Sequence, residues 1–278
     1  MNHAKVFTAL ILWFLSAGAS AQAFFEYALF YENKYVGDLS IQYSSGDEGS
    51  YIVEQKYQIK SKGFFGIGGM ELKNTLVETY TDNGLLLRAD NKLIERSKLF
   101  WTLSELSRDE YLVFRAQLKN EQEKEEEEFI ELVKDVAAHL VPGAGEVFAI
   151  GELILSDGHE AVVGTRFPRD GFDTTFLGIP YLWRNLGYML PDSMHIFDTE
   201  EMHIYFADIE YQGEEYHSID GAVVTSHHYT LKTSGTDLTD IKIASADSGE
   251  PYFLEVLGNS YRVLLTAKQA VILSSVLE

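Results

Sequence analysis

The 278-residue sequence contains no cysteine, and this absence excludes several kinds of protein. No disulfide framework can form, and no thiol nucleophile is available. Basic residues are also scarce: 22 Lys and Arg stand against 43 Asp and Glu, which gives a net charge of −21. Because nucleic-acid-binding proteins neutralise phosphates with basic side chains, we expect no nucleic acid partner. An anionic membrane surface would repel the chain for the same reason.

The sequence also lacks the motifs of familiar enzymes. No Gly-x-Ser-x-Gly nucleophile elbow and no His-Glu-x-x-His zinc motif is present. The glycine-rich segment Gly63–Gly69 has no Lys-Ser/Thr pair of the kind that a phosphate-binding loop requires. We therefore expect no enzymatic activity, no catalytic residues, no metal and no cofactor. A hydrolase of unfamiliar type stays open as a functional class, although no constellation of residues supports it.

Histidines are the remaining candidates for metal binding or acid/base chemistry. His227 and His228 are adjacent on an expected strand, so their side chains should point to opposite faces and cannot share one metal ion. His227 falls on the apolar face, which favours a core histidine, and His228 falls on the polar face. Asp192, His195 and Asp198 are spaced three apart and would converge on a helix. The preceding proline and the polar composition favour a loop instead.

Residues 1–23 have the pattern of a secretory signal peptide. A short polar start with Lys5 precedes an apolar run from Val6 to Ala17, and the small-residue pattern Ala21-Gln22-Ala23 follows. The apolar run is too short to span the ~30 Å hydrocarbon core of a bilayer as a stable helix. We predict cleavage after Ala23, no lipid modification and no integral membrane segment after processing, with the protein located in the bacterial periplasm. A buried N-terminal helix is the alternative.

The chain after the signal is dominated by expected β-strands. Apolar and polar residues alternate in Tyr35–Tyr43 and in Tyr51–Lys60, which is the two-residue period of a strand with one buried face. The positions expected on the covered face include Tyr35, Leu39, Ile41, Tyr43, Tyr51, Val53, Tyr57 and Ile59. Weaker strand patterns occupy Glu71–Tyr80, Leu85–Glu95, Tyr111–Lys119, Glu201–Tyr211, Gly221–Lys232, Thr239–Ala244, Tyr252–Leu257 and Tyr261–Thr266.

Between the two groups of strands the spacing changes to that of a helix. Apolar residues fall at Phe129, Val133, Val136 and Leu140. We predict a helical insertion over 120–156 that covers the buried face of the strands. The glutamate-rich stretch 121–128 is interpreted as a solvated helix face, because adjacent carboxylates on a helix cannot converge on one calcium ion.

These patterns predict a mainly β (α+β) protein with one strongly curved antiparallel sheet and a central helical insertion packed on it. No repeat, low-complexity tract or linker divides the chain, so residues 24–278 are expected to form a single β-rich domain. Its expected parts are N-terminal strands (24–119), a helical insertion (120–156), an aromatic loop region (157–200) and C-terminal strands (201–278).

Two aromatic segments are candidates for a ligand site. Adjacent phenylalanines in the glycine-rich turn should direct at least one ring toward solvent, a rim or a ligand. The stretch Phe172–Trp183 either fills the open side of the sheet as core or lines a slot for an apolar ligand. The candidate rim of this slot consists of Phe64, Phe65, Phe172, Phe176, Tyr181 and Trp183.

The strand segments also resemble known families. Phe25–Tyr31, followed by Asn33–Leu39, resembles the opening of the exported bacterial domains of unknown function DUF3108 and DUF6134. Lys60–Gly66 looks like their next hairpin, and Ile219–Gly221 and Gly249–Tyr252 match the order of their late segments. The resemblance implies a curved antiparallel sheet wrapped on helices, similar to the LolA/LolB lipoprotein-carrier shape. It implies no established chemistry.

Three functional classes follow from these observations. We expect a non-enzymatic periplasmic binding or carrier-like protein for an apolar or amphiphilic ligand, such as a lipid. The alternative is a protein-interaction module, either an immunity or an envelope-assembly factor, whose acidic surface binds a basic protein partner. A large apolar cavity would favour the first class, and a closed core with an acidic patch the second. Converging His, Asp and Glu side chains in a cleft would favour a hydrolase.

Overall fold

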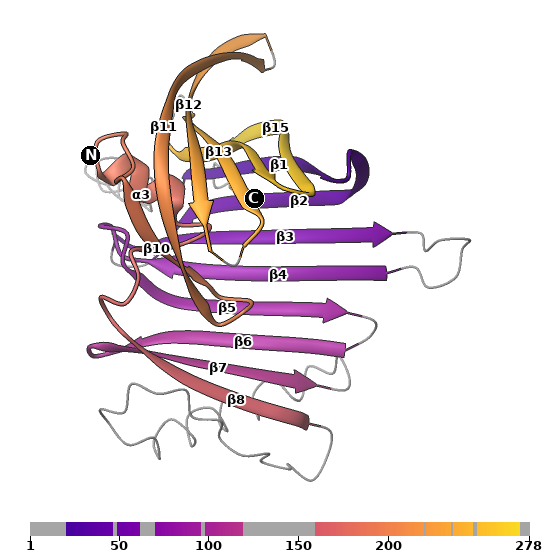
Figure 1. The fold of residues 1–278 in the computed structure, drawn as a ribbon, viewed down its shortest axis with the longest axis vertical. Helices are drawn as coiled ribbons and strands as arrows, with labels where there is room; N and C mark the ends of the chain where they lie inside the picture. Colours follow the sequence, from indigo (N-terminus) through magenta and orange to yellow (C-terminus); the bar gives the residue numbers. More distant parts are fainter. Residues whose placement is uncertain are drawn as a thin grey trace, which may run out of the picture.

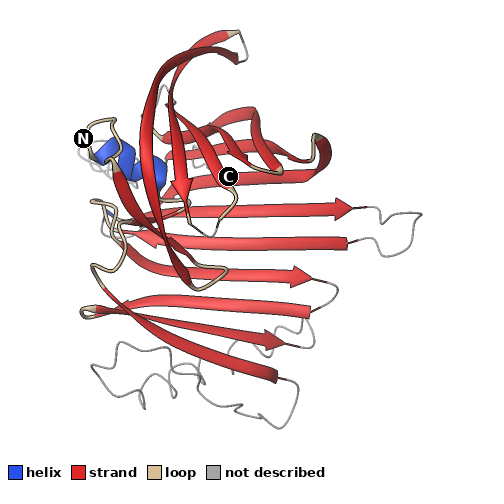
Figure 2. Cartoon of the chain, in the orientation of Figure 1, coloured by secondary structure: helices blue, strands red, loops and turns tan. Residues whose placement is uncertain are grey.

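One large β-sheet dominates the protein. The structure is a computed structural model that describes residues 21–46, 49–61, 70–95, 98–118, 159–219, 221–234, 236–246 and 249–272. These residues form a 15-stranded sheet and one short helix, α3 (Ile179–Asn185) (Figures 1 and 2). Neighbouring strands are antiparallel except for the parallel pair β9–β10. The prediction of one antiparallel sheet is therefore confirmed, apart from this short edge pair.

The sheet contains two groups of strands. The N-terminal strands are β1 (Ala21–Tyr31), β2 (Lys34–Ser45), β3 (Tyr51–Ser61), β4 (Met70–Tyr80), β5 (Leu86–Glu95), β6 (Lys98–Ser107), β7 (Glu110–Leu118) and β8 (His159–Pro168). The C-terminal strands are β9 (Thr174–Thr175), β10 (Ser193–Asp198), β11 (His203–Ile219), β12 (Ala222–Thr233), β13 (Leu238–Ser245), β14 (Pro251–Gly258) and β15 (Tyr261–Ile272). Every predicted strand is present, while β6, β8, β9 and β10 were not predicted.

The two groups meet at the pairing of β1 with β15, which makes the sheet continuous from β8 to β9. The sheet then bends so strongly that strands distant in its order touch each other. The rings of Phe167 on β8 and Phe197 on β10 lie 5.4 Å apart, centroid to centroid. Register shifts, as between Glu26 and Tyr27, interrupt the β1–β15 ladder, and such bulges bend a strand. The predicted strong curvature is thus present (Figure 1).

The predicted covered face is confirmed in its central part. Ile41, Tyr43 and Val53 are buried, and Leu39 and Tyr57 are partly covered. The prediction for Tyr35 is wrong, because a register shift after Leu29 places Tyr35 beside Phe30 at the exposed end of the β1–β2 hairpin.

The predicted helical cover, residues 120–156 with Phe129, Val133 and Val136, lies outside the described residues. Within the described part of the chain, α3 lies on the covered face instead. Its Tyr181 ring stacks on the ring of Tyr51, with 3.9 Å between the centroids. This helix is seven residues long.

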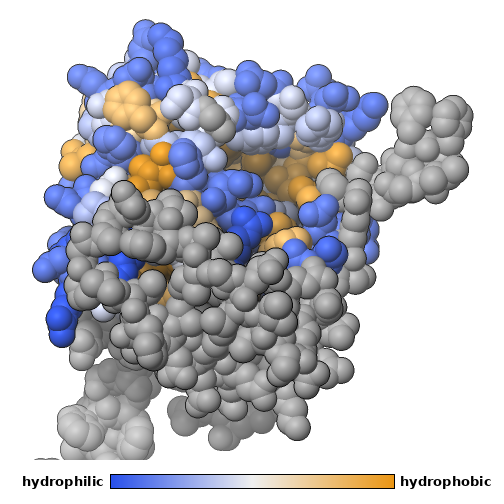
Figure 3. Space-filling view, turned by 60° about the horizontal axis from the view of Figure 1, so that its bottom comes forward, coloured by the Kyte–Doolittle hydropathy of each residue, from blue (hydrophilic) through white to orange (hydrophobic). Residues whose placement is uncertain are grey.

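The predicted signal cleavage site occupies the start of β1. Ala21, Gln22 and Ala23 pair with the end of β15, and Ala23 is buried. Among the described residues, no helix is both long and apolar enough to cross a membrane. On the face drawn in Figure 3, the described residues are largely hydrophilic, with hydrophobic ones gathered in patches between them.

Candidate functional site

The first candidate site is an apolar hollow beside the turn that joins β1 to β2. Its volume is about 500 Å³. The residues that line it come from β1, β2, β3 and β15, and they are Leu29, Phe30, Tyr31, Val36, Ile59, Tyr261, Arg262 and Val263. Seven of the eight carry a hydrocarbon or aromatic side chain, so the hollow suits an apolar group.

A row of paired residues crosses four strands at the apolar hollow. Val263, Leu29, Gly37 and Ile59 form one row across β15, β1, β2 and β3. Leu29 follows Phe25 and Tyr27 at the two-residue period of a strand, so the row lies on the core face. At Gly37 a Cβ atom would lie only 2.0 Å from the backbone oxygen of Gln58. Glycine is therefore required there, because β2 and β3 approach each other closely at this point.

The mouth of the apolar hollow is more polar than its floor. Tyr31 is exposed at the hairpin end, and Arg262, which pairs with the neighbouring Phe30, is exposed as well. The Arg262 guanidinium is held by Glu255, with 2.5 Å between Nε and Oε1. An apolar floor below a polar mouth is the arrangement that an amphiphile with a hydrocarbon tail requires.

The second candidate site is a smaller polar hollow inside the bend of the sheet. Its volume is about 160 Å³. It lies between inward-facing residues of β3, β4 and β5 and the segment around the end of β10. Its lining residues are Gln55, Asn74, Leu76, Glu78, Asn91, Phe176, Leu177, Phe197, Asp198, Thr199 and Glu200.

Glu78 is the most deeply buried carboxyl group of this hollow, with 1% of its surface exposed. Its Oε2 accepts hydrogen bonds from the Tyr80 hydroxyl and, at 2.8 Å, from Thr175 Oγ1. Its Oε1 has no hydrogen-bond partner. Burial raises the pKa of Glu78 to about 7, against the opposing effect of these two hydrogen bonds.

Glu200 is the second carboxyl group with a raised pKa. Burial and the nearby Asp198 raise the pKa of Glu200 to about 7, while Arg115 and a hydrogen bond with Tyr57 oppose the shift. The guanidinium of Arg115 donates to the backbone oxygen of Glu200 at 3.0 Å. Asp198 shapes the turn by accepting the backbone N–H of Glu200 at 2.8 Å.

Two buried amides complete the polar hollow. Asn74 Nδ2 donates to Asn91 Oδ1 at 2.6 Å, which links β4 to β5 on the inner face. Asn74 Oδ1 has no hydrogen-bond partner, although only 4% of the residue is exposed. The two unsatisfied buried atoms of this hollow, on Glu78 and Asn74, are therefore both hydrogen-bond acceptors.

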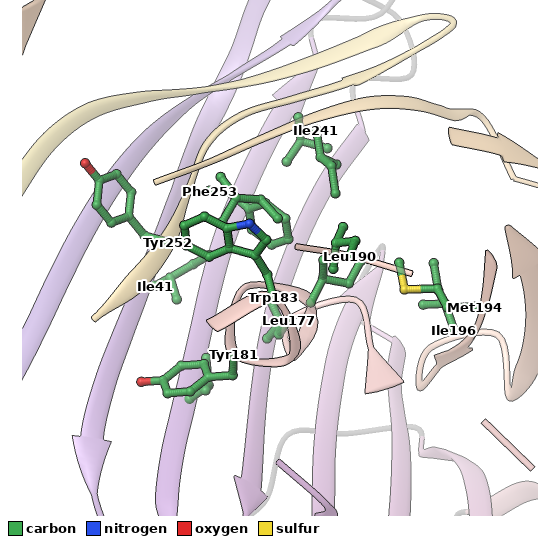
Figure 4. Close-up of a cluster of buried hydrophobic side chains, with 14 of the residues drawn as sticks. Ile41, Leu177, Tyr181, Trp183, Leu190, Met194, Ile196, Ile241, Tyr252 and Phe253 are labelled. Carbon is green, nitrogen blue, oxygen red and sulfur yellow. The ribbon is translucent and has the colours of Figure 1, made fainter. Parts of the chain in front are cut away.

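The predicted aromatic rim divides into three groups. Phe172, Tyr181 and Trp183 are buried in the core, where Trp183 Nε1 donates to the Tyr229 hydroxyl at 3.1 Å (Figure 4). Phe176 stacks on Phe253 and borders the polar hollow. Phe64 and Phe65 lie outside the described residues. The stretch from Phe172 to Trp183 thus has the placement expected for the core alternative, and none of its residues lines the apolar hollow.

The side chains of the histidines singled out by the sequence lie apart from one another in the described part of the chain. As predicted, the side chains of His227 and His228 lie on opposite faces of the strand. The ring of His227 lies edge-on to Trp183, and the ring of His228 lies between Glu215 and Asp240, each 3.1 Å away. His195 is on strand β10, so the predicted loop is wrong there, and on a strand His195 and Asp198 face opposite sides. Among the described residues, no group of three His, Cys, Asp or Glu could hold a metal ion.

One serine–histidine pair also fails as catalytic machinery. The hydroxyl of Ser226 lies 2.8 Å from Nε2 of His217, and Glu215 approaches the same nitrogen at 3.6 Å. In a nucleophile–base–acid relay, the acid must contact the other ring nitrogen. The buried Ser226 hydroxyl and this histidine therefore form a structural contact.

Comparisons with known proteins support the fold but identify no family. No family model and no curated protein sequence matches the chain. A solved structure from Brucella abortus, described as a beta-barrel-like protein of the domain of unknown function DUF1849, superposes with a TM-score of 0.54. The match covers 91% of this chain and 98% of that chain, at 9% sequence identity. The chain therefore shares a β-rich, barrel-like fold with a domain of unknown function, while DUF3108 and DUF6134 specifically receive no support.

Proposed function

We propose that the protein is a non-enzymatic binding or carrier protein that holds the hydrocarbon part of an amphiphile in the periplasm. The observation that carries the proposal is the apolar hollow of about 500 Å³ at the β1–β2 turn. This volume lies within the range of roughly 300–1,000 Å³ that is typical of small-molecule sites. The barrel-like fold of the Brucella protein is compatible with such a role.

The energy available from burying a hydrocarbon tail is sufficient for useful affinity. Each buried methylene contributes ~0.8 kcal/mol, so a ten-carbon tail could contribute roughly 8 kcal/mol before the costs of association. Dissociation constants in the micromolar range correspond to about 8 kcal/mol of net binding energy. Longer tails, or contacts of the polar end with Tyr31 or Tyr261, would compensate for the association cost.

We expect decanoic acid and a neutral decyl glycoside, both below their micelle concentrations, to bind saturably with a negative heat-capacity change in calorimetric titration. Ile59→Asp should weaken both at least about tenfold, because the new carboxylate would lose hydration beside the tail. Val223→Asp is the matched control, since Val223 lies outside the hollow and is 76% exposed. Unchanged binding by a folded Ile59→Asp variant, or no binding of either amphiphile, would contradict the proposal.

The periplasmic location predicts a processed N-terminus. Protein recovered from the periplasm of a bacterial host should have the intact mass of a chain that starts at Phe24, without a lipid adduct. Cleavage there would remove Ala21–Ala23 from the start of β1 and leave the rest of its pairing with β15 available. Detection of residues 1–23 in the periplasmic protein, or of an acyl modification, would overturn this part of the proposal.

One observation favours the protein-interaction alternative. The tip of the β11–β12 hairpin extends past the residues of β12 that pair with β13, Ser226–Thr230 (Figure 1). Tyr216 and Val223 near this tip are 73% and 76% exposed. Exposed apolar side chains on a projecting hairpin suit contact with another protein. Failure of every amphiphile to bind would move the functional assignment to this alternative.

A further inference from the structure

The polar hollow has an excess of hydrogen-bond acceptors. Glu78 Oε1 and Asn74 Oδ1 are buried there without partners. A buried polar atom without a partner is unfavourable, so such atoms point to a partner that arrives from outside the chain. Because both atoms are acceptors when Glu78 is ionised, that partner must supply hydrogen-bond donors.

The charge of the hollow has the same sign throughout its lining. Glu78, Asp198 and Glu200 contribute carboxyl groups, and no lysine, arginine or histidine is among the lining residues. Arg115 reaches the backbone oxygen of Glu200, which leaves the carboxylate of Glu200 without a bidentate arginine. A cation is therefore the partner that the electrostatics favour.

The remaining lining residues restrict the kind of cation. The rings of Phe176 and Phe197 and the side chains of Leu76 and Leu177 give the hollow apolar walls. A metal ion would gain nothing from these walls, and no group of three carboxylates or imidazoles among the described residues is arranged to hold one. An organic cation can contact the rings through its carbon atoms and donate hydrogen bonds through its nitrogen.

We propose that this hollow binds a primary ammonium group, carried either by a small free amine or by the head group of an amine-bearing lipid. An ammonium group has three N–H donors, of which one can be donated to the buried Glu78 Oε1. The volume of about 160 Å³ admits a group of a few heavy atoms and excludes a bulky head group. The proposal is independent of the apolar hollow, which shares no lining residue with this one.

Binding of an ammonium group should strengthen as the pH rises. Since the pKa of Glu78 is about 7 in the free protein, the carboxylate that attracts the cation is mostly protonated at about pH 6 and mostly ionised at about pH 8. Several other titratable or charged groups surround Glu78 and Glu200, the two carboxyl groups with raised pKa values. These groups are Tyr43, Tyr51, Tyr57, Tyr80, Arg115, Asp198 and Glu201. The phenol pKa values of Tyr43, Tyr51, Tyr57 and Tyr80 are all raised, so these groups stay neutral over this range.

The test is a titration at constant ionic strength with ethanolamine as the free amine. Ethylene glycol is the uncharged control, and tetramethylammonium is the cation without N–H donors. We expect saturable binding of ethanolamine only, with an affinity that rises about tenfold between about pH 6 and about pH 8. Glu78→Gln keeps the shape of the side chain and should lower the affinity at about pH 8 by at least about tenfold. Glu71→Gln, an exposed change on the same strand, should leave it unaltered.

A second experiment with lipids distinguishes the two sources of the ammonium group. Short-chain phosphatidylethanolamine is compared with phosphatidylcholine of the same chain length. Preferential binding of the ethanolamine lipid, together with weaker binding of free ethanolamine, assigns the site to a lipid head group; the reverse assigns it to a free amine. Ile59→Asp should not change ethanolamine binding, so failure of the carrier proposal and failure of this one can be told apart. If neither amine form binds at about pH 8, or if Glu78→Gln binds equally well, the proposal is wrong and water fills the hollow.

Discussion

Truncating Trp183 to alanine should lower the free energy of unfolding by about 4 kcal/mol, as is typical of large aromatic residues in a packed core. Trp183 is 2% exposed and donates a hydrogen bond to Tyr229, and its ring contacts His227 edge-on. Its removal would leave a cavity in the cluster of buried side chains that Figure 4 shows and would remove one hydrogen bond from the Tyr229 hydroxyl. Urea unfolding monitored by circular dichroism measures the loss.

Two control variants separate packing from hydrogen bonding. Trp183→Phe keeps an aromatic ring and should lose less than half as much stability as the alanine variant. Tyr188→Ala removes an exposed ring that touches Trp183 from the side, and it should change the unfolding free energy by less than about 1 kcal/mol. A loss below about 1 kcal/mol for Trp183→Ala itself would mean that this ring is not part of the core.

Glu78→Gln should change the pH dependence of stability by roughly 3 kcal/mol between about pH 4 and about pH 8. Burial raises the pKa of Glu78 to about 7 in the folded protein, whereas an unfolded glutamate has a pKa of about 4.3. The folded state therefore binds this proton more tightly. The contribution of Glu78 to stability is complete below the unfolded pKa, and it is lost as the pH rises toward 7.

The neutral glutamine removes this loss, so the variant should gain stability relative to the wild type as the pH rises from about 4 to about 8. Unfolding in urea at several pH values measures the difference. Glu71→Gln is the control, and its effect on stability should change with pH in the opposite direction. The reason is that a hydrogen bond with Gln58 and the charge of Lys60 lower the pKa of Glu71. A difference between wild type and Glu78→Gln that does not vary with pH would show that the buried carboxyl has an ordinary pKa.

Strands could be predicted from the sequence where one face is apolar and buried and the other is polar and exposed. Elements without this contrast or too short to show a period were missed. β2 and β3 alternate and were predicted with nearly correct bounds. β6 was not predicted, although Trp101–Ser104 alternate apolar and polar residues. All four are buried, so its hydroxyl-bearing face is covered as well. Helix α3 is only seven residues long, which gives too few turns for a helical period to be visible; Pro180 is its second residue.

The polar hollow could have been detected in the sequence from polar residues that occupy buried positions of the apolar–polar alternation. Asn74, Leu76, Glu78 and Tyr80 share one face of β4, and the neighbouring apolar residues mark this face as buried. A glutamate in the buried phase of a strand is rare unless it is paired or functional. The same reasoning applies to Asn91, which lies on β5 between the inward-facing Ala89 and Leu93.

The apolar hollow could not be predicted in the same way. Its row of Val263, Leu29, Gly37 and Ile59 joins residues from both ends of the chain, and their juxtaposition depends on the β1–β15 pairing. The sequence left the most aromatic segment, Phe172–Trp183, open as either core or ligand site. That segment packs into the core because its large rings fill the bend between the two groups of strands.

The central claim is that a hydrocarbon tail occupies the apolar hollow beside Tyr31. Tyr31→Trp places a fluorescent side chain at an exposed position of the rim, and a bromine-labelled fatty acid quenches tryptophan on contact. The account predicts saturable quenching of the added tryptophan that is absent from the wild type and that Ile59→Asp abolishes. Quenching that is the same with and without the added tryptophan would place the ligand elsewhere and contradict the account.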